Sequence, residues 1–599
     1  MRSWIAPPEE KATAEALQRR LLGRPTHGRG TAHGRGTGTR RRPSDRVRAG
    51  SARLSGWLLH HAVWLLPVLI TALAAWLRLA HLAQPHDLTF DETYYVKDAF
   101  TLLQSGYERQ WPEEGADEQF LAGEPQPLGE ASYVVHPPLG KWLIGLGMLV
   151  FGTDNGLGWR FAAAVAGTLS VPLVYLVGRR LLGSTALAAS AALLTAVDGH
   201  HIVMSRTALL DIFLMLFVLA AFYALLRDRE DGRRRLAAAL ARADRIDRRD
   251  TRRRAPDDSP GAGSASTARS RGRLPEPPFL YGPWLLWRPW RLVAGLLLGA
   301  AVGVKWSALA FVAVFGLMTV LWDVGARRAA GIRHWLAAGL LREGIPAFLT
   351  IVPAAAAAYL ASWSGWLAAP GGYDRQWAAE HPEEAWPLVP DAVRSLIEYH
   401  RSAFEFHGGL DSDHSWESGP ETWLVAGRPV LFHFETVDGG QGACRFDSCT
   451  YVITDLPNPV LWWTAALAVL VVLLYWAGRR DWRAGAILSG IAAGFVPWWF
   501  FPDRTMFFFY TIAFHPFLML AVAYVIGLML NPSASRAPAT GGVSGGRPVG
   551  LEQRRVGLAV VGVYLALVLA VSAFFLPVWT GQPMGPEGWH LRLWLPSWG

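Results

Sequence analysis

The chain has 599 residues, of which 51% are hydrophobic and only 18% are charged, and its formal net charge is +9. A soluble protein of this length would form several domains with charged surfaces, and this composition excludes that class. The positive charge does not indicate a nucleic-acid partner, because the arginines cluster beside long apolar runs, as in the cytoplasmic loops of membrane proteins. We therefore expect an all-α polytopic membrane protein.

The chain begins with a basic segment, residues 1–56, that is rich in Arg, Gly, Pro and Ser and has almost no apolar periodicity. We expect it to be a disordered cytoplasmic tail. The apolar segment 57–82 comes too late and is too long for a signal peptide, so it is predicted to be the first membrane span. The first outer loop, 83–157, follows. Its apolar run 142–151 is too short to cross the bilayer and predicts a helix at the membrane interface.

The remaining long apolar runs complete a regular pattern of crossings. With run 142–151 outside, every arginine cluster falls on one side of the membrane, which supports the count. The N-terminus is then cytoplasmic, and the active site and the C-terminus are extracytoplasmic, at the plasma membrane. We predict about eleven spans, at residues 57–82, 159–182, 184–201, 207–226, 292–304, 308–322, 348–367, 460–476, 486–499, 506–529 and 556–576.

Three groups of spans are separated by two polar segments. The groups are an N-terminal transmembrane catalytic module at 57–226, further helices at 292–367 and a C-terminal transmembrane module at 458–599.

The two polar segments differ in character. Residues 227–291 are basic and rich in Pro, Ser and Gly, which predicts a largely disordered cytoplasmic linker with one candidate surface helix over 233–254. Residues 368–457 are rich in Trp, His, Gly and Asp and are predicted to be an extracytoplasmic loop. Its two cysteines, Cys444 and Cys449, fit a local disulfide and free thiols about equally well.

Asp91 and Glu92 lie shortly after the first span. Placing two adjacent carboxylates so close to lipid costs free energy, which indicates that they serve a function. Under the predicted topology, acids and cations from distant spans reach the same outer face. Each alone fits a charge at a helix end that extends to the interface, but together they indicate a cavity for an anionic lipid head group. These residues are His136, Arg160, Asp198, His200, Arg206, Asp211, Lys305 and Arg504.

These residue types suit displacement at a sugar carbon with a lipid phosphate as the leaving group. A carboxylate can act as base for the incoming hydroxyl, and guanidinium groups stabilise the charge that grows on the phosphate. One carboxylate opposite the phosphate is enough for a single inverting displacement, whereas a double displacement needs a nucleophile as well. We assign Asp91 as the base. No His or acidic cluster has metal-ligand spacing, so neither a metal nor another cofactor is expected.

A series of motifs runs from about residue 60 to the end of the chain: FDETYY at 90–95, VHPPLGK at 135–141, GWRF at 158–161, LSVPLVY at 169–175, DGH at 198–200, LDIF at 210–213, VKWS at 304–307, SGW at 364–366 and RTMF at 504–507. In this order they resemble the bacterial, actinobacterial-type protein O-mannosyltransferases. The resemblance implies the GT-C fold and inverting transfer of mannose from polyprenyl-phosphate mannose to Ser or Thr hydroxyls of exported proteins. It also implies acceptor polypeptides as partners, with the Sec translocon as their candidate source.

The resemblance also implies residue roles. Asp91 is the base, and Glu92 is an acidic neighbour that positions the acceptor or the base. The candidate donor-binding residues are Arg160, Arg206, Arg504, Lys305 and His136, with Asp211, Asp198 and His200 as a supporting network. Eukaryotic members carry a β-trefoil MIR domain in the loop that corresponds to 368–457, and this loop is too short for one.

Two other classes of protein remain as alternatives. One is a different GT-C transferase, which moves aminoarabinose or arabinose to a lipid or glycan and shares the Asp-Glu opening. An oligosaccharyltransferase fits less well, because the Trp-Trp-Asp-Tyr-Gly signature is missing. The other class is a lipid flippase or transporter, which would place ionisable residues near mid-membrane and often shows inverted repeats. Here the charges gather at one face, which favours the enzyme.

Overall fold

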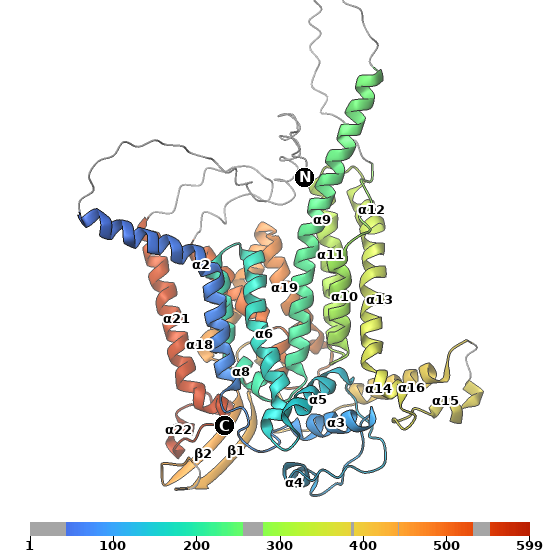
Figure 1. The fold of residues 1–599 in the computed structure, drawn as a ribbon, viewed down its shortest axis with the longest axis vertical. Helices are drawn as coiled ribbons and strands as arrows, with labels where there is room; N and C mark the ends of the chain where they lie inside the picture. Colours follow the sequence, from blue (N-terminus) through green and yellow to red (C-terminus); the bar gives the residue numbers. More distant parts are fainter. Residues whose placement is uncertain (1–42, 255–279, 385–387, 441–442, 531–550) are drawn as a thin grey trace, which may run out of the picture.

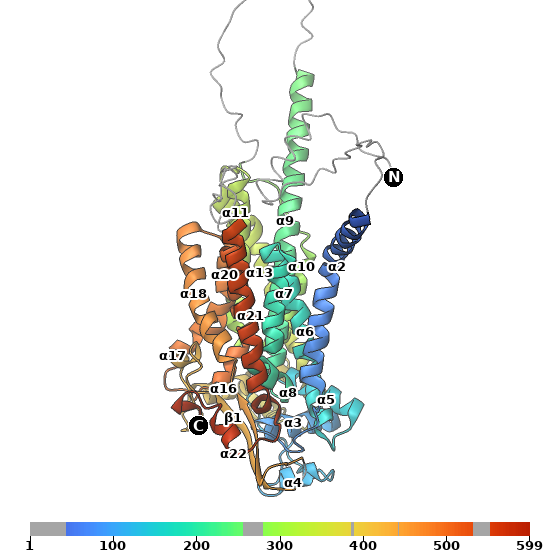
Figure 2. The same cartoon turned by 90° about the vertical axis from the view of Figure 1, so that its left-hand side faces the viewer.

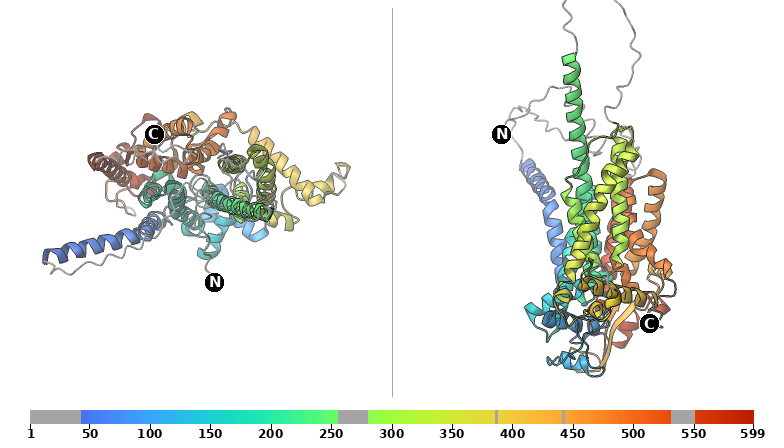
Figure 3. Two further views of the ribbon diagram at one scale, coloured as in Figure 1. Left: turned by 90° about the horizontal axis from the view of Figure 1, so that it is seen from above. Right: turned by 90° about the vertical axis from the view of Figure 1, so that its right-hand side faces the viewer.

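The computed structural model describes residues 43–254, 280–384, 388–440, 443–530 and 551–599. Long helices run side by side along one axis, and the short elements gather at one end of the bundle, which we call the outer end (Figure 1). The opposite end carries the start of α2 and the far end of α9. The same separation is visible from two other sides (Figures 2 and 3).

The bundle is built from helices that follow the predicted order of apolar segments. In chain order they are α2 (Pro43–Leu79), α6 (Gly156–Leu182), α7 (Thr185–Val197), α8 (Gly199–Arg206), α9 (Asp211–Arg254), α10 (Pro289–Val302), α11 (Ala308–Ala329), α12 (Trp335–Gly339), α13 (Ile345–Ser362), α18 (Pro459–Arg479), α19 (Trp482–Phe495), α20 (His515–Leu530) and α21 (Leu551–Thr580). A π-helical turn, Leu340–Gly344, joins α12 to α13.

The outer end consists of short elements from every part of the chain. They are α3 (Glu92–Ser105), α4 (Ala116–Leu121), α5 (Leu139–Phe151), α14 (Ser364–Ala368), α15 (Trp377–Glu380), α16 (Asp391–Gly408), α17 (Pro420–Trp423), the strands β1 (Val430–Asp438) and β2 (Ser448–Asp455), and α22 (Pro586–His590). Figure 1 shows α14 to α16 projecting on one side of this end and the strands on the other.

Polar caps begin several bundle helices at the residues that the sequence supplies. The Asn155 side chain accepts a hydrogen bond from Gly158 N at the start of α6, and that helix ends at Gly183 with a φ of 67°. Only residues that tolerate positive φ fit such a left-handed C-cap, and glycine does so without steric cost. Asp198 caps α8, and α7 and α8 meet there at an angle of 58°.

The helices have the composition of a multi-pass membrane protein. Among the described residues, six helices are long and apolar enough to cross a membrane, and the bent pair α7–α8 makes a seventh. The other four predicted spans correspond to α9, α10, α19 and α20. The count of eleven therefore stays a prediction. Large apolar side chains such as Trp64, Leu474 and Val563 are exposed on the bundle, as expected of surfaces that face lipid.

Two segments predicted to be disordered are partly ordered. Residues 43–56 belong to α2, because a helix continues past its membrane segment once a nucleus exists. Residues 1–42 lie outside the described residues. The predicted helix over 233–254 is present as the end of α9, but it continues the bundle helix and extends away from the bundle (Figure 1). Residues 255–279 lie outside the described residues.

Buried ion pairs fix the ordered part of this linker. Asp228 of α9 accepts a 2.6 Å hydrogen bond from Arg288, and Asp323 of α11 accepts one of the same length from Arg291. Glu343 pairs with Arg327 at 2.5 Å. Because isolated buried charges are costly, this network ties α9, α10 and α11 together at the end opposite the short elements.

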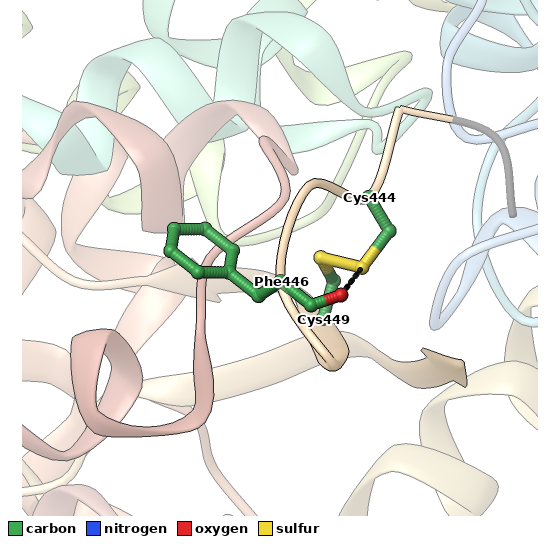
Figure 4. The surroundings of a disulfide bond; sticks show 3 residues. All are labelled: Cys444, Phe446 and Cys449. Carbon is green, nitrogen blue, oxygen red and sulfur yellow. Dashed lines mark hydrogen bonds between the residues drawn. A yellow bond between two sulfur atoms is a disulfide. The ribbon is translucent and has the colours of Figure 1, made fainter. Parts of the chain in front are cut away.

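A β-hairpin in the loop 368–457 is a feature that the helical prediction did not contain. β1 and β2 pair antiparallel, with Thr436 opposite Thr450. At the turn, Cys444 and Cys449 form a disulfide, which settles the alternative that the sequence left open (Figure 4).

Candidate active site

Asp91 lies at the outer end, directly before the first turn of α3. The preceding residue, Phe90, has a φ of 52°, which is uncommon for a residue with a side chain and marks backbone strain of a kind that clusters at functional sites. The Phe90 ring stacks on Phe432 of β1, with a centroid distance of 4.9 Å, and meets Phe507 edge-on. These contacts hold the turn that presents Asp91.

The Asp91 carboxylate is partly buried and keeps most of its hydrogen-bonding capacity. Tyr95 donates a long hydrogen bond of 3.4 Å to its Oδ2 atom, and the Asp91 side chain does not cap α3. Burial raises the pKa of Asp91 to about 6, Lys305 opposes the rise, and Asp211 adds to it. A carboxyl group with a pKa in this range is a base at neutral pH and a better proton acceptor than an ordinary aspartate.

Glu92, in contrast, is fully buried and has no free oxygen. Arg160 of α6 donates two hydrogen bonds to its carboxylate, from Nε at 2.9 Å and from Nη2 at 2.7 Å. Thr89 donates from its backbone N and its hydroxyl, and Ala208 N donates at 2.7 Å. Glu92 thus connects three separate parts of the chain. This end of the molecule also contains two large cavities, described below, and Glu92 lines neither of them.

Arg160 and Arg206 are also occupied by structural contacts. Arg160 donates to the carbonyls of Pro85 and Asp87 in addition to Glu92. Arg206 donates to the carbonyls of residues 77, 78, 80 and 81, at and just beyond the end of α2, where helix carbonyls lack intrahelical partners. The structure therefore places both arginines as backbone clamps, and neither lines the cavity described next.

A cavity of about 320 Å³ lies beside Asp91 and has one charged end and one apolar end; we call it the cationic cavity. Lys305, between α10 and α11, points its Nζ to Asp211 Oδ2 at 2.6 Å. Both side chains line the cavity. Asp91 does not line it, but both side chains act electrostatically on the Asp91 carboxyl and shift its pKa. The apolar end is lined by α11 and α19 residues, including Leu309, Phe311, Ala493 and Trp498.

Arg504 and two histidines complete the charged end. Arg504 donates to His407 O at 3.0 Å, and its Nε is buried without a partner among the described residues. The ring of His407 stacks on that of His136, with centroids 5.2 Å apart. Burial, together with Arg504, lowers the pKa of His407 to about 4, and burial, together with Lys305, lowers the pKa of His136. Both imidazoles are therefore neutral at pH 7, and the fixed cations are Lys305 and Arg504.

Asp198 and His200 lie elsewhere, in a buried polar network inside the bundle. His200 Nδ1 is 2.7 Å from Asp455 Oδ1 at the end of β2, and its Nε2 faces Thr511 at 3.1 Å. Asp198 accepts from Asn458 N and lies 3.2 Å from His515 Nε2. This network joins α8 to the end of the hairpin and to α20, so it supports the outer end without lining the cationic cavity.

The sequence predictions therefore divide into two sets. The structure brings Asp211, Lys305, His136 and Arg504 to one cavity, with Asp91 within electrostatic reach of Lys305 and Asp211, and places the other predicted residues in surrounding supports: Glu92, Arg160, Arg206, Asp198 and His200. Sequence reasoning gave no site role to His407, Tyr95 and Tyr510, which contact or line the site. The neighbouring motifs were their only signal, since Tyr95 ends FDETYY and Tyr510 follows RTMF. Within the described ranges, no group of three or more His, Cys, Asp or Glu side chains is arranged to hold a metal ion.

Known proteins are similar to this chain in both sequence and fold. The family model for dolichyl-phosphate-mannose-protein mannosyltransferase matches residues 68–240, and the model for the C-terminal four-transmembrane region of protein-O-mannosyltransferase matches residues 392–598. The polyprenol-phosphate-mannose–protein mannosyltransferase of Mycolicibacterium smegmatis is 36% identical over 547 residues, which cover 89% of this chain and 93% of that protein. The enzyme of the same name from Mycobacterium tuberculosis is 35% identical over 559 residues, covering 91% and 92%.

A solved structure supports the same assignment at the level of the fold. The S. cerevisiae protein O-mannosyltransferase Pmt1–Pmt2 complex bound to the sugar donor superposes with a TM-score of 0.61 at 15% identity, and the match covers 90% of this chain and 92% of that one. The bundle with its decorated outer end is thus a GT-C fold. By its sequence, this chain belongs to the dolichyl-phosphate-mannose-protein mannosyltransferase family.

Proposed function

We propose that this chain transfers mannose from polyprenyl-phosphate mannose to Ser or Thr hydroxyls of polypeptides, with inversion at the sugar carbon. The observation that carries this proposal is the position of Asp91 beside a cavity that is apolar at one end and cationic at the other. A prenyl chain suits the apolar walls, and a phosphate suits Lys305 and Arg504.

The reaction needs three events at one sugar carbon, and the site supplies a group for each. Asp91 accepts the proton of the acceptor hydroxyl. The hydroxyl oxygen forms a bond to C1 of mannose while the bond from C1 to the phosphate oxygen breaks. The polyprenyl phosphate leaves with the electron pair, and Lys305 and Arg504 stabilise its charge. A single displacement of this kind inverts the configuration, because the new bond forms on the face opposite the leaving group.

The proposal needs no metal ion. Asp211 accepts one hydrogen bond from the Lys305 ammonium group, which has further N–H donors for a phosphate, and Glu92 is paired with Arg160. Asp91 alone offers too few oxygens for a hard cation, which takes several converging ligands. The cations that meet the phosphate are instead side chains of the chain itself.

We further propose the orientation of the molecule. The arginine clusters and the basic segment that ends α9 lie at the end opposite the active site, which fits a cytoplasmic N-terminus under the positive-inside rule. The active site and the C-terminus then face outward across the plasma membrane. Acceptors would reach the site as exported polypeptides, and the Sec translocon is the source that we propose for them.

The direct test is a transfer assay with purified components. Incubating the purified chain with polyprenyl-phosphate mannose and a Ser/Thr-rich peptide is expected to add one hexose mass to the peptide. Digestion with linkage-specific mannosidases then reports the anomeric configuration. A peptide that stays unmodified while the aminoarabinose or arabinose donors react would replace this proposal with the other GT-C chemistry.

Arg504→Ala is expected to lower kcat/KM for the lipid donor by roughly 10²–10³, because it removes a positioned donor of hydrogen bonds to the leaving phosphate. Arg504→Lys is expected to lose less, since it keeps the charge but not the bidentate fork. The measurement is initial rate against donor concentration. Arg428→Ala is the matched control, because Arg428 is also at the outer end, donates to Ser415 O and does not line the cationic cavity. Equal rates for Arg504→Ala and Arg428→Ala would remove Arg504 from the donor site.

A further inference from the structure

A second and larger cavity, of about 1150 Å³, lies at the outer end between the end of α2, the loop that follows it, the β-hairpin and the end of α21. We call it the hairpin groove. His433 and Glu435 of β1 and Tyr451 of β2 lie on one wall, and Asp87 and Gln582 come from the neighbouring segments. None of these residues lines the cationic cavity, so the two cavities are separate sites.

The charge of the hairpin groove differs from that of the cationic cavity. His433 Nδ1 lies 3.4 Å from Asp87, and its Nε2 lies 3.8 Å from Glu435 without a hydrogen-bond partner among the described residues. The fixed cation at the groove, Arg206, is committed to the backbone carbonyls at the end of α2. A lining that is neutral to acidic and rich in hydrogen-bonding groups suits a polypeptide better than a phosphate.

The strand β1, which lines this groove, has an unused row of backbone groups along one edge. Thr450 of β2 exchanges both of its backbone hydrogen bonds with Met584, so its N–H and C=O point away from β1. Thr436, opposite Thr450, then directs its own groups to the other edge of β1, and alternation gives Phe434 the same direction. Among the described residues, no strand pairs with that edge. An edge of this kind is a template for an extended peptide.

The hairpin groove and the cationic cavity lie on two sides of the turn that carries Asp91. Asp87 lines the groove, and four Cα–Cα steps of 3.8 Å place Asp91 within about 15 Å of it. Phe90 packs on Phe432 of β1 and also on Phe507, so its ring stands between the hairpin and the RTMF segment of the cationic cavity. An inverting displacement requires the acceptor and the leaving group on opposite faces of the sugar, and two separate cavities on either side of the Phe90–Asp91 turn fit this requirement.

We propose that the hairpin groove is the acceptor site, in which the polypeptide lies extended along the free edge of β1 and delivers its hydroxyl to Asp91. This inference rests on the proposed mannosyl transfer. Backbone pairing at Phe434 and Thr436 would hold acceptors of many sequences, because it uses no side chain of the acceptor. The neutral and acidic wall would favour acceptors without clusters of acidic residues.

A kinetic comparison of two substitutions at one position tests the role of the strand edge. Thr436→Pro removes the outward N–H from β1 without removing a hydrogen bond to β2, whereas Thr436→Val keeps the N–H. Thr436→Pro is expected to raise KM for the peptide at least about tenfold, the equivalent of one good hydrogen bond, and to leave KM for the lipid donor unchanged. Thr436→Val is expected to raise KM for the peptide far less than Thr436→Pro does, because it keeps the N–H, and an equal rise for both would overturn the role of the strand edge. A rise in KM for the donor would assign the groove to lipid and overturn the proposal.

A cross-linking experiment reports on the groove without depending on transfer. Gln582 is exposed on the groove, and the native cysteines are already paired with each other. Gln582→Cys is expected to form a mixed disulfide with a cysteine-containing Ser/Thr peptide, and excess unmodified peptide should prevent it. Val393 is also exposed, but it belongs to α16 on the other side of the outer end (Figure 1), so Val393→Cys should not react above background. Equal reaction at both positions overturns the acceptor site, and absence of transfer by the native protein overturns the proposed function separately.

Discussion

Asp91→Asn is expected to lower mannose transfer by about 10²- to 10⁴-fold, the range that a positioned general base contributes. The substitution keeps the volume of the side chain and removes its basicity. The carboxylate makes one long hydrogen bond, to Tyr95, and does not cap α3, so the fold does not depend on it. The measurement is the initial rate of hexose addition to the peptide at saturating donor. The thermal midpoint of the purified variant should equal that of the native protein.

Asp503→Asn is the matched control for this substitution, because Asp503 is an exposed acid at the same end of the molecule and next to Arg504. It should retain the native rate. Asp91→Asn at the native rate would show that another group takes the proton.

The pH dependence of the native enzyme provides an independent check on the same residue. Asp91 must be ionised to accept a proton, and its pKa is about 6. Activity is therefore expected to be full above this value and to fall about tenfold per pH unit below it, as the base becomes protonated. Donor analogues that bind without reacting should show no such fall if the change lies in the chemical step.

The fold was predictable from sequence to the extent that it depends on hydrophobic length and charge. Runs such as 159–182 and 556–576 reappear as α6 and α21, because a bilayer requires apolar helices of about this length. The hairpin was not predictable in the same way. Val430–Asp438 and Ser448–Asp455 lie in a polar loop whose composition gave no strand signal. They pair with each other, and contacts from distant segments, the Phe90–Phe432 stack and the bridge from Thr450 to Met584, hold the hairpin in place.

The site was predictable only as a set of residue types. The motifs at the outer face were enough to propose Asp91 as a base and a set of candidate donor-binding residues, Arg160, Arg206, Arg504, Lys305 and His136. The sequence could not separate Arg504 from Arg160 and Arg206, since all three follow the same pattern of an arginine near a span end. Their hydrogen bonds separate them. Arg160 and Arg206 donate to backbone carbonyls, and Arg160 also to Glu92, whereas Arg504 lines the cationic cavity.

Glu92→Gln is expected to destabilise the folded protein by about 3–5 kcal/mol, because it leaves the guanidinium of Arg160 buried without a counter-charge. The amide also cannot accept every hydrogen bond that the Glu92 carboxylate receives from Thr89, Ala208 and Arg160. The measurement is thermal unfolding of the purified protein in detergent. Asp117→Asn is the matched control, since Asp117 pairs with Lys97 at 2.6 Å but is 39% exposed, and such pairs contribute at most about 1 kcal/mol.

A double substitution distinguishes a structural role of Glu92 from a chemical one. In Glu92→Gln/Arg160→Gln neither residue is charged, so part of the lost stability should return. Transfer should return with it, because the Glu92–Arg160 pair acts by holding the turn that presents Asp91. If Glu92→Gln instead keeps the native thermal midpoint and loses transfer, Glu92 takes part in the reaction itself. The ion pair thus explains why the two adjacent acids have different roles. Glu92 anchors the backbone of the turn through Arg160, and Asp91 remains available to the substrate.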